Sequence, residues 1–325
     1  MRRRDFLLLS GSVVVWPCLS RAQQAAAPVV GFLHSGSKLR SPHIRGFGAG
    51  LGEIGFVDGQ NVTVRYRFAE GRYDQLGAMV ADFLNANVSV IVAVGGVHTA
   101  IAARSASASI PVVFANGSDP VRFGLVESLN RPGGNMTGVS LFTATLEAKR
   151  LGLLAELVPA ARSFGVLINQ ANDNAEMQLK DVAKGGVLLG RPISIQKASN
   201  AQEIEAAFAT FSQQGINALL VASDPYFFGD REKILALAAR YKLPAIYEWR
   251  EFAEAGGLAT YGTNLFDNYR MAGQYVGRVL KGEKPATLPV FQATKFEFVI
   301  NLKTAKMLGI EVSPTVSARA DDIIE

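Results

Sequence analysis

Runs of apolar residues that end in small polar loops recur along this chain and predict a parallel α/β architecture. The clearest run, residues 88–94, is rich in β-branched side chains and is closed by Gly95 and Gly96, as in a fully buried strand that ends in a tight turn. An alanine-rich segment then predicts a helix, and residues 110–114 predict the next strand. This βαβ unit places polar loops at the carboxyl ends of its strands, where open α/β sheets bind ligands.

The same unit recurs later in the chain, which favours two similar lobes. Residues 218–221 precede a polar loop, a predicted helix and a further apolar run at 243–247. Residues 31–34 resemble residues 165–168. The apolar run at residue 110 begins 79 positions after residue 31, and the one at residue 243 begins 78 positions after residue 165. Chance similarity within any doubly wound protein is the alternative explanation.

The remaining periodic segments complete the predicted lobes. Strands are expected at 29–34, 61–68, 136–141, 163–168, 193–196, 257–261 and 296–301. Helices are expected at 42–54, 73–86, 121–129, 145–157, 175–189, 201–214, 230–241, 264–280 and 302–308. We therefore predict a doubly wound α/β protein with lobe one at 28–140 plus 263–290 and lobe two at 141–262 plus 291–325.

Composition supports two domains and argues against nucleic-acid binding. A chain of 325 residues that is 49% hydrophobic can bury two cores. Four of its 33 basic residues lie in the first 22 positions, and the rest of the chain carries a net charge of only +2. No basic stripe stands out there. Cys18 is the sole cysteine, so the remainder has no disulfide or thiolate nucleophile.

The first 22 residues predict an export signal. Arg3-Arg4-Asp5 begins a twin-arginine pattern, an apolar stretch follows, and Ala22 ends a small-residue cleavage site. The apolar stretch is too short for a stable membrane span. The mature protein is expected to be soluble, periplasmic and monomeric, with cleavage near Ala22.

Metal and hydrolytic chemistry find little support in the sequence. The three histidines lack partners at metal-binding spacing, and no nucleophile elbow occurs after residue 22. We expect no metal, no cofactor and no catalytic residue. A hydrolase using Asp119 or Asp224 remains an alternative, although each precedes a proline, as residues that open turns do.

A binding cleft is the function that the loops favour. Gly95, Gly96 and Thr99 open a helix and suit a carboxylate, with Ser35 and Gly36 as further donors. Other loop residues supply charged groups, amides or aromatic rings for a ligand. For the aromatic residues, the alternative role is packing at the interface between the lobes. The additional candidate ligand-binding residues are His98, Asp119, Asn169, Asn174, Asp224, Phe227, Trp249 and Tyr261. Asp224 is expected to hold an ammonium group, while Phe227 and Trp249 line a side chain.

Several long motifs resemble one protein family. They include YRFAEGRY at 66–73, LNRPGGN at 129–135, YEWREF at 247–252 and KFEFVINLKTA at 295–305. The chain resembles, over essentially its whole mature length, the substrate-binding proteins of ABC transporters that include tryptophan- and tyrosine-binding members. This resemblance implies a type I periplasmic-binding fold: two Rossmann-like lobes, a three-crossover hinge and a cleft that closes on ligand.

The function expected from residues and resemblance together is that of an exported solute receptor. It would capture a small amino acid-like or aromatic ligand, such as an amino acid or an aromatic acid, and present it to the permease and ATPase of an importer. The first alternative function is that of an extracytoplasmic ligand-sensing module for a receptor kinase.

Overall fold

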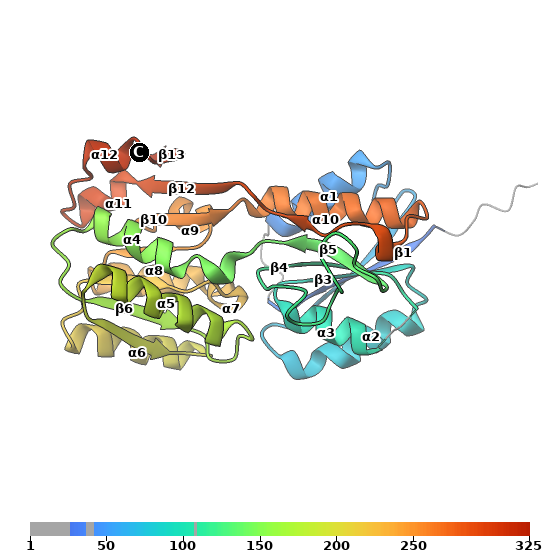
Figure 1. Ribbon diagram of the computed structural model, residues 1–325, viewed down its shortest axis with the longest axis horizontal. Coiled ribbons are helices and arrows are strands. Elements are labelled where there is room, and N and C mark those ends of the chain that lie inside the picture. The colour runs from blue at the N-terminus through green and yellow to red at the C-terminus, as the bar shows by residue number, and fades with distance from the viewer. Residues whose placement is uncertain (1–26, 37–41, 107–108) are drawn as a thin grey trace, which may run out of the picture.

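The computed structural model describes residues 27–36, 42–106 and 109–325. The predicted signal peptide and Cys18 lie outside the described residues. Two lobes lie side by side, and each is built on its own sheet (Figure 1). No helix within the described ranges is long and apolar enough to cross a bilayer.

The sheet of lobe one is parallel throughout and has the order β11-β5-β4-β3-β1-β2. Its strands are β1 (Val29–His34), β2 (Thr63–Phe68), β3 (Val90–Val94), β4 (Val112–Asn116), β5 (Met136–Ser140) and β11 (Phe291–Gln292). The helices that cover it are α1 (Pro42–Glu53), α2 (Leu76–Asn85), α3 (Val97–Ala106) and α10 (Leu265–Leu280). In β3, alternate side chains face α1 and α10 on one side and α2 and α3 on the other, which explains its unbroken apolar run.

The sheet of lobe two has the order β13-β12-β10-β9-β8-β6-β7, with β12 antiparallel to β10. Its strands are β6 (Phe164–Ile168), β7 (Ile193–Lys197), β8 (Ala218–Val221), β9 (Ala245–Tyr247), β10 (Ala259–Thr263), β12 (Phe296–Asn301) and β13 (Asp322–Ile324). Its helices are α4 (Glu147–Leu157), α5 (Ala175–Leu189), α6 (Ala201–Gln213), α7 (Pro225–Gly229), α8 (Arg231–Arg240), α9 (Arg250–Glu254), α11 (Leu302–Met307) and α12 (Pro314–Ser317).

The strand order confirms the internal repeat predicted from the sequence. Strands β1 to β5 and strands β6 to β10 follow the same order, with the first strand of each set between the second and the third. The fold is therefore the predicted pair of doubly wound lobes. In this topology a crevice opens at the carboxyl ends of β1 and β3, and a second at those of β6 and β8.

Three segments connect the lobes: residues 141–146, residue 264 and residues 293–295. The expected lobe boundaries differ slightly from the sheet pairing. Residue 263 belongs to β10, and β11 at 291–292 pairs with β5 of the first sheet. Because β11 has only two residues, its sequence shows no alternation of apolar and polar residues from which a strand could be predicted.

Residues 121–129 are not the helix that their sequence suggested. The segment forms turns, because Gly124 takes a positive φ of 63° and Asp119 Oδ1 accepts the amide of Val121 in an Asx turn. Helices α7, α9 and α12 were not predicted, since four or five residues are too few to show a helical period.

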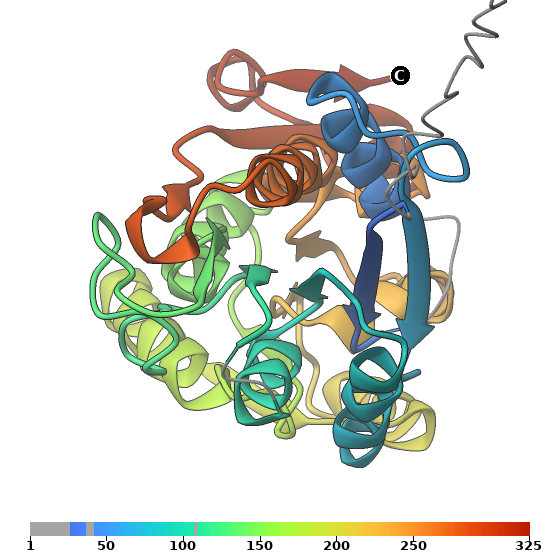
Figure 2. The same ribbon diagram turned by 90° about the vertical axis from the view of Figure 1, so that its right-hand side faces the viewer.

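Helices α1 and α10 pack with their backbones unusually close, side by side in both views (Figures 1 and 2). A Cβ atom on Gly50 would overlap the carbonyl oxygen of Arg270, and one on Gly273 would overlap that of Phe47. Glycines thus set the spacing between α1 and α10, and α10 begins directly after the second crossing segment.

We predict that Gly50→Ala destabilises the protein, because the added methyl group forces α1 away from α10. Overpacking of this kind costs about 1–3 kcal/mol. Gly52→Ala is the matched control on the same helix: nothing lies within 4 Å of its Cβ position, and alanine favours helix by up to about 1 kcal/mol. Urea unfolding measures both variants. Equal stability of the two would refute the close-packing explanation.

Candidate functional site

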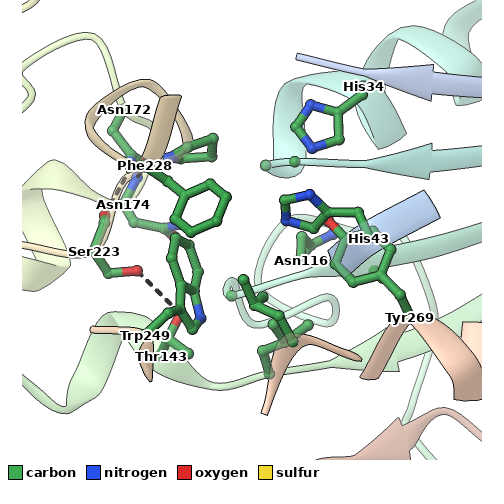
Figure 3. Close-up of a pocket in the computed structure, with 17 residues that line it drawn as sticks. His34, His43, Asn116, Thr143, Asn172, Asn174, Ser223, Phe228, Trp249 and Tyr269 are labelled. Carbon is green, nitrogen blue, oxygen red and sulfur yellow. Dashed lines mark hydrogen bonds between the residues drawn. The ribbon is translucent and has the colours of Figure 1, made fainter. Parts of the chain in front are cut away.

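A small cavity lies between the lobes at the carboxyl ends of their strands (Figure 3). Its volume is about 50 Å³, well below the roughly 300–1,000 Å³ of typical ligand sites. Its lining comes from both lobes: His34, His43, Gly95, Gly96, Ala115, Asn116, Gly117, Leu141, Thr143, Asn172, Asn174, Ser223, Pro225, Phe228, Trp249, Leu265 and Tyr269. This is where the topology places a ligand.

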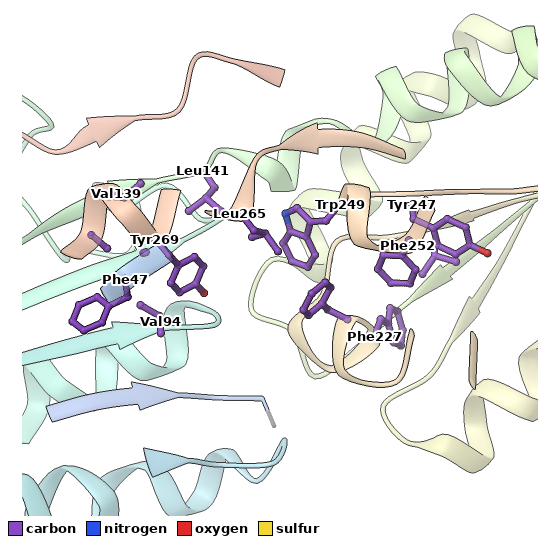
Figure 4. Close-up of a cluster of buried hydrophobic side chains, with 14 of the residues drawn as sticks. Phe47, Val94, Val139, Leu141, Phe227, Tyr247, Trp249, Phe252, Leu265 and Tyr269 are labelled. Atoms are coloured by element: carbon purple, nitrogen blue, oxygen red, sulfur yellow. The ribbon is translucent and has the colours of Figure 1, made fainter. Parts of the chain in front are cut away.

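Aromatic rings close the cavity from both sides. His43 on α1 lies 4.4 Å from the Tyr269 ring of α10 and 5.3 Å from Phe228 of lobe two, measured between ring centroids. Phe228 in turn contacts Trp249 edge to face at 5.1 Å. Buried apolar side chains of the two lobes therefore form one continuous cluster (Figure 4). The cavity is small because His43 and Phe228 meet across it.

His34 at the end of β1 presents a hydrogen-bond donor to the cavity. The amide of Gly36 donates to His34 Nδ1 at 2.8 Å, so the proton of the neutral ring resides on Nε2. Burial lowers the pKa of His34 to about 4, which keeps the ring neutral. Its Nε2 atom is buried and has no partner.

The turn after β3 gives His34 its room. Gly95 has a φ of 80°, and a Cβ atom there would lie 2.8 Å from His34 Cε1. Ser35 Oγ donates to the Gly95 carbonyl, and Thr99 Oγ1 donates to the Gly96 carbonyl at 2.8 Å. These two hydroxyls hold the glycine turn rather than line the cavity.

Three further polar atoms around the cavity are buried without a partner. They are Asn116 Nδ2, Trp249 Nε1 and Asn174 Oδ1. With His34 Nε2, the unpartnered set comprises three donors and one acceptor, on side chains no more than 7% exposed. Buried polar atoms of this kind cost roughly 1–3 kcal/mol each unless a ligand or water pairs with them.

Direct contacts join the lobes around the cavity. Asn174 Nδ2 of lobe two donates to Ser118 Oγ of lobe one at 2.8 Å. His98 at the start of α3 lies with Nδ1 3.0 Å from Asp173 Oδ2 and Nε2 3.2 Å from the Ala171 carbonyl oxygen. The lobes therefore contact each other directly beside the cavity, and His98 belongs to this contact rather than to the cavity lining.

Of the residues predicted from sequence, Gly95, Gly96, Asn174 and Trp249 line the cavity. Asp224 instead caps α7: its carboxylate accepts from the amides of Tyr226 and Phe227 and from the side chains of Asn169 and Asn172. The four donors that its oxygens accept from all belong to lobe two, which leaves it little capacity for a ligand ammonium group.

The other predicted residues lie away from the cavity. Asp119 opens an Asx turn, and Phe227 is in the lobe-two core. Tyr261 stacks on Phe296, and its carbonyl oxygen accepts from Arg150 Nε at 2.7 Å. In each case the side chain serves the packing of its own lobe.

Sequence reasoning missed more than half of the lining. Asn116 ends β4 and Ser223 follows β8, so their strand-end positions could have identified them. His43 and Tyr269 lie on helices α1 and α10, and no local pattern distinguishes a helix residue that reaches the cleft from one that faces the core.

A sequence profile described as "ABC transporter substrate binding protein" matches residues 31–324. The chain belongs to this family. A tyrosine-binding protein of Clostridioides difficile is 26% identical over 267 residues, which cover 82% of this chain and 76% of that protein.

Two solved structures are similar at 25% identity and a TM-score of 0.83. One is an ABC domain in complex with L-Trp from Streptococcus pneumoniae, covering 92% of this chain and all of its own. The other is a conserved domain protein from Vibrio cholerae, covering 91% of this chain and 99% of its own. The family's two-lobed architecture is thus shared over nearly the whole chain.

A buried ionic network lies next to the cleft of this substrate-binding protein. Glu147 accepts from Arg150 Nη1 at 2.8 Å, from the Ser223 amide and from Gln178 Nε2. Glu248 lies 4.0 Å from Arg150 Nη2, and burial raises its pKa to about 8. One guanidinium thus lies beside two carboxyl groups, and burial keeps Glu248 protonated at neutral pH.

We predict that stability falls as pH rises from about 6.5 to 8.5. At lower pH the buried neutral rings of His34 and His43, whose folded-state pKa values lie below the unfolded value of 6.5, act in the opposite direction. Because the folded-state pKa of Glu248, about 8, lies above its unfolded value of 4.5, the folded protein binds more protons between about pH 6.5 and 8.5, and the free energy of unfolding decreases by about 2 kcal/mol. Glu248→Gln should flatten this dependence, as measured by thermal unfolding at several pH values.

Glu251→Gln is the matched control for this prediction. Burial raises the pKa of Glu251 to about 7, so its removal flattens only the lower part of the same range. A pH dependence that Glu248→Gln leaves unchanged above pH 7 would refute the protonated state of Glu248.

Proposed function

We propose that this protein is the exported receptor of an ABC importer and that it captures a small amino acid-like or aromatic ligand by closing its two lobes. The observation that carries this proposal is the cavity between the lobes, with unpartnered polar atoms contributed by both. The tyrosine-binding relative and the L-Trp complex support this ligand class.

Closure is a shift of population between open and closed states. A ligand that contacts His34 and Asn116 on one lobe and Trp249 and Asn174 on the other gains its full set of bonds only in the closed state, and therefore favours that state. The crossing segments at 141–146, 264 and 293–295 are short enough to act as the hinge.

Export and partners complete the proposal. Residues 1–22 serve as a twin-arginine-type signal, and the mature protein acts in the periplasm as a monomer without a cofactor. The closed, loaded form is delivered to a permease and its ATPase, because closure brings surfaces of both lobes into one arrangement that the transporter recognises.

Binding without turnover is supported by the state of the cleft carboxyl groups. Asp119 lies in a surface turn, and Asp224 is engaged by four donors. Glu248 is protonated and separated from the cavity by Ser223 and Thr143, which line it. Among the described residues, this arrangement offers no pair of carboxyl groups facing one substrate, as glycoside hydrolysis would require.

A thermal-shift screen against amino acids and aromatic acids tests the proposal. A ligand selective for the folded form raises the melting temperature. Small-angle X-ray scattering should then show a smaller radius of gyration with that ligand, and mass spectrometry should recover it unaltered. A ligand that binds without compaction would contradict closure, and conversion of the ligand would contradict a receptor function.

We predict that His98→Ala weakens ligand binding up to about fivefold. His98 bridges the closed lobes at a partly exposed position, where such a contact contributes up to about 1 kcal/mol. Lys180→Ala is the control, since Lys180 pairs with Glu176 within α5 alone. Calorimetry with the ligand found by the screen measures both. Equal weakening by the two variants would show that the rim contact does not support closure.

A further inference from the structure

The described part of the cavity lining is electrically neutral. Among residues 27–36, 42–106 and 109–325, no lysine, arginine, aspartate or glutamate lines the cavity. Burial lowers the pKa of both lining histidines, His34 and His43, so that each ring is uncharged. The described lining therefore offers a ligand neutral donors and acceptors.

Those partners are predominantly donors. His34 Nε2, Asn116 Nδ2 and Trp249 Nε1 each carry a proton with no acceptor, whereas Asn174 Oδ1 is the single unpartnered acceptor of the four. The ten-residue helix α3 also begins at Val97, directly after the lining residues Gly95 and Gly96, and the positive end of its dipole favours an anion. The set matches a carboxylate or another group with several acceptor atoms.

In the part of the chain that the structure describes, a ligand ammonium group has no comparable place. The carboxylate of Asp224 is already satisfied by Asn169, Asn172 and the α7 amides, and Glu248 is protonated. Arg231 of lobe two lies 4.9 Å from the Phe228 ring centroid, and its charge contributes to the lowered pKa of His43, so it adds positive potential beside the cavity. Burial of a cation here would leave it without an anionic partner.

The apolar part of the ligand meets aromatic rings. His43 and Phe228 lie 5.3 Å apart across the cleft, with Tyr269 and Trp249 beside them (Figure 3). A planar ring that enters when the lobes part can pack against His43 from lobe one and Phe228 from lobe two. Flat aromatic groups suit this narrow space better than bulky aliphatic ones.

We propose that this cleft selects aromatic acids that lack an α-ammonium group over the corresponding aromatic amino acids. This inference rests on the proposed receptor function and specifies its ligand. The carboxylate is held by His34 Nε2, Asn116 Nδ2 and the α3 terminus, and the ring lies among His43, Phe228 and Trp249.

Matched ligand series test the proposal in calorimetry with the wild-type protein. The first is indole-3-propionate, L-tryptophan and tryptamine; the second is 3-(4-hydroxyphenyl)propionate, L-tyrosine and tyramine. We expect the acid to bind at least tenfold more tightly than the amino acid in at least one series, and the amine to bind most weakly. Tighter binding of the amino acid would overturn this inference and leave the receptor function intact. Absence of binding in both series would overturn both.

Asn116→Asp provides an independent check. Its Oδ1 atom can still accept the Ser118 amide, while the unpartnered donor becomes an acceptor with negative charge. We expect the acid to lose at least tenfold in affinity and the preference to shift toward the amino acid. Asn217→Asp, at an exposed position before β8, adds the same charge away from the cleft and should change neither. Circular dichroism verifies folding, and unchanged acid binding by Asn116→Asp would overturn the assigned role.

Discussion

The constraint on which this structure depends is that a buried hydrogen-bonding atom needs a partner. Where the two lobes meet, His34, Asn116, Trp249 and Asn174 are buried, and one polar atom of each is unpaired. Each unpaired atom costs free energy in this arrangement. A ligand that pairs with several of them at once would remove that penalty, and this is the physical basis of the closure that we propose.

Close contacts hold the elements that follow the first and second crossing segments. In lobe one, α10 follows the second crossover and is locked against α1 through glycines at its contact face. In lobe two, Arg150 of α4 follows the first crossover and ties Glu147 to the backbone of Tyr261 at β10.

The sequence predicted the architecture because burial leaves a clear pattern. Strands buried on both faces read as unbroken apolar runs, and the repeat of the βαβ unit revealed two lobes with the same strand order. The glycine turn after β3 was also evident, since Gly95 needs a positive φ. Family resemblance, carried by motifs such as YEWREF at 247–252, indicated the same fold independently.

The composition of the site was harder to predict because it depends on contacts between distant segments. Asp224 looked like a ligand partner, but it is a helix cap whose oxygens are occupied within its own lobe. His43 and Tyr269 reach the cavity only because α1 and α10 pack closely beside the strand ends. Hydrophobic periodicity and local motifs do not indicate which polar atoms remain without a partner where the two lobes meet.

The protonation of His34 provides the most direct test of this account. Nitrogen-15 NMR of the histidine rings, recorded at pH 7 with and without saturating ligand from the screen, reports which ring nitrogen carries the proton. We expect a neutral ring with the proton on Nε2 in both states, and a large change in the Nε2 proton shift when ligand accepts that bond. A charged ring, a proton on Nδ1, or an Nε2 signal that the ligand leaves unchanged would contradict the account.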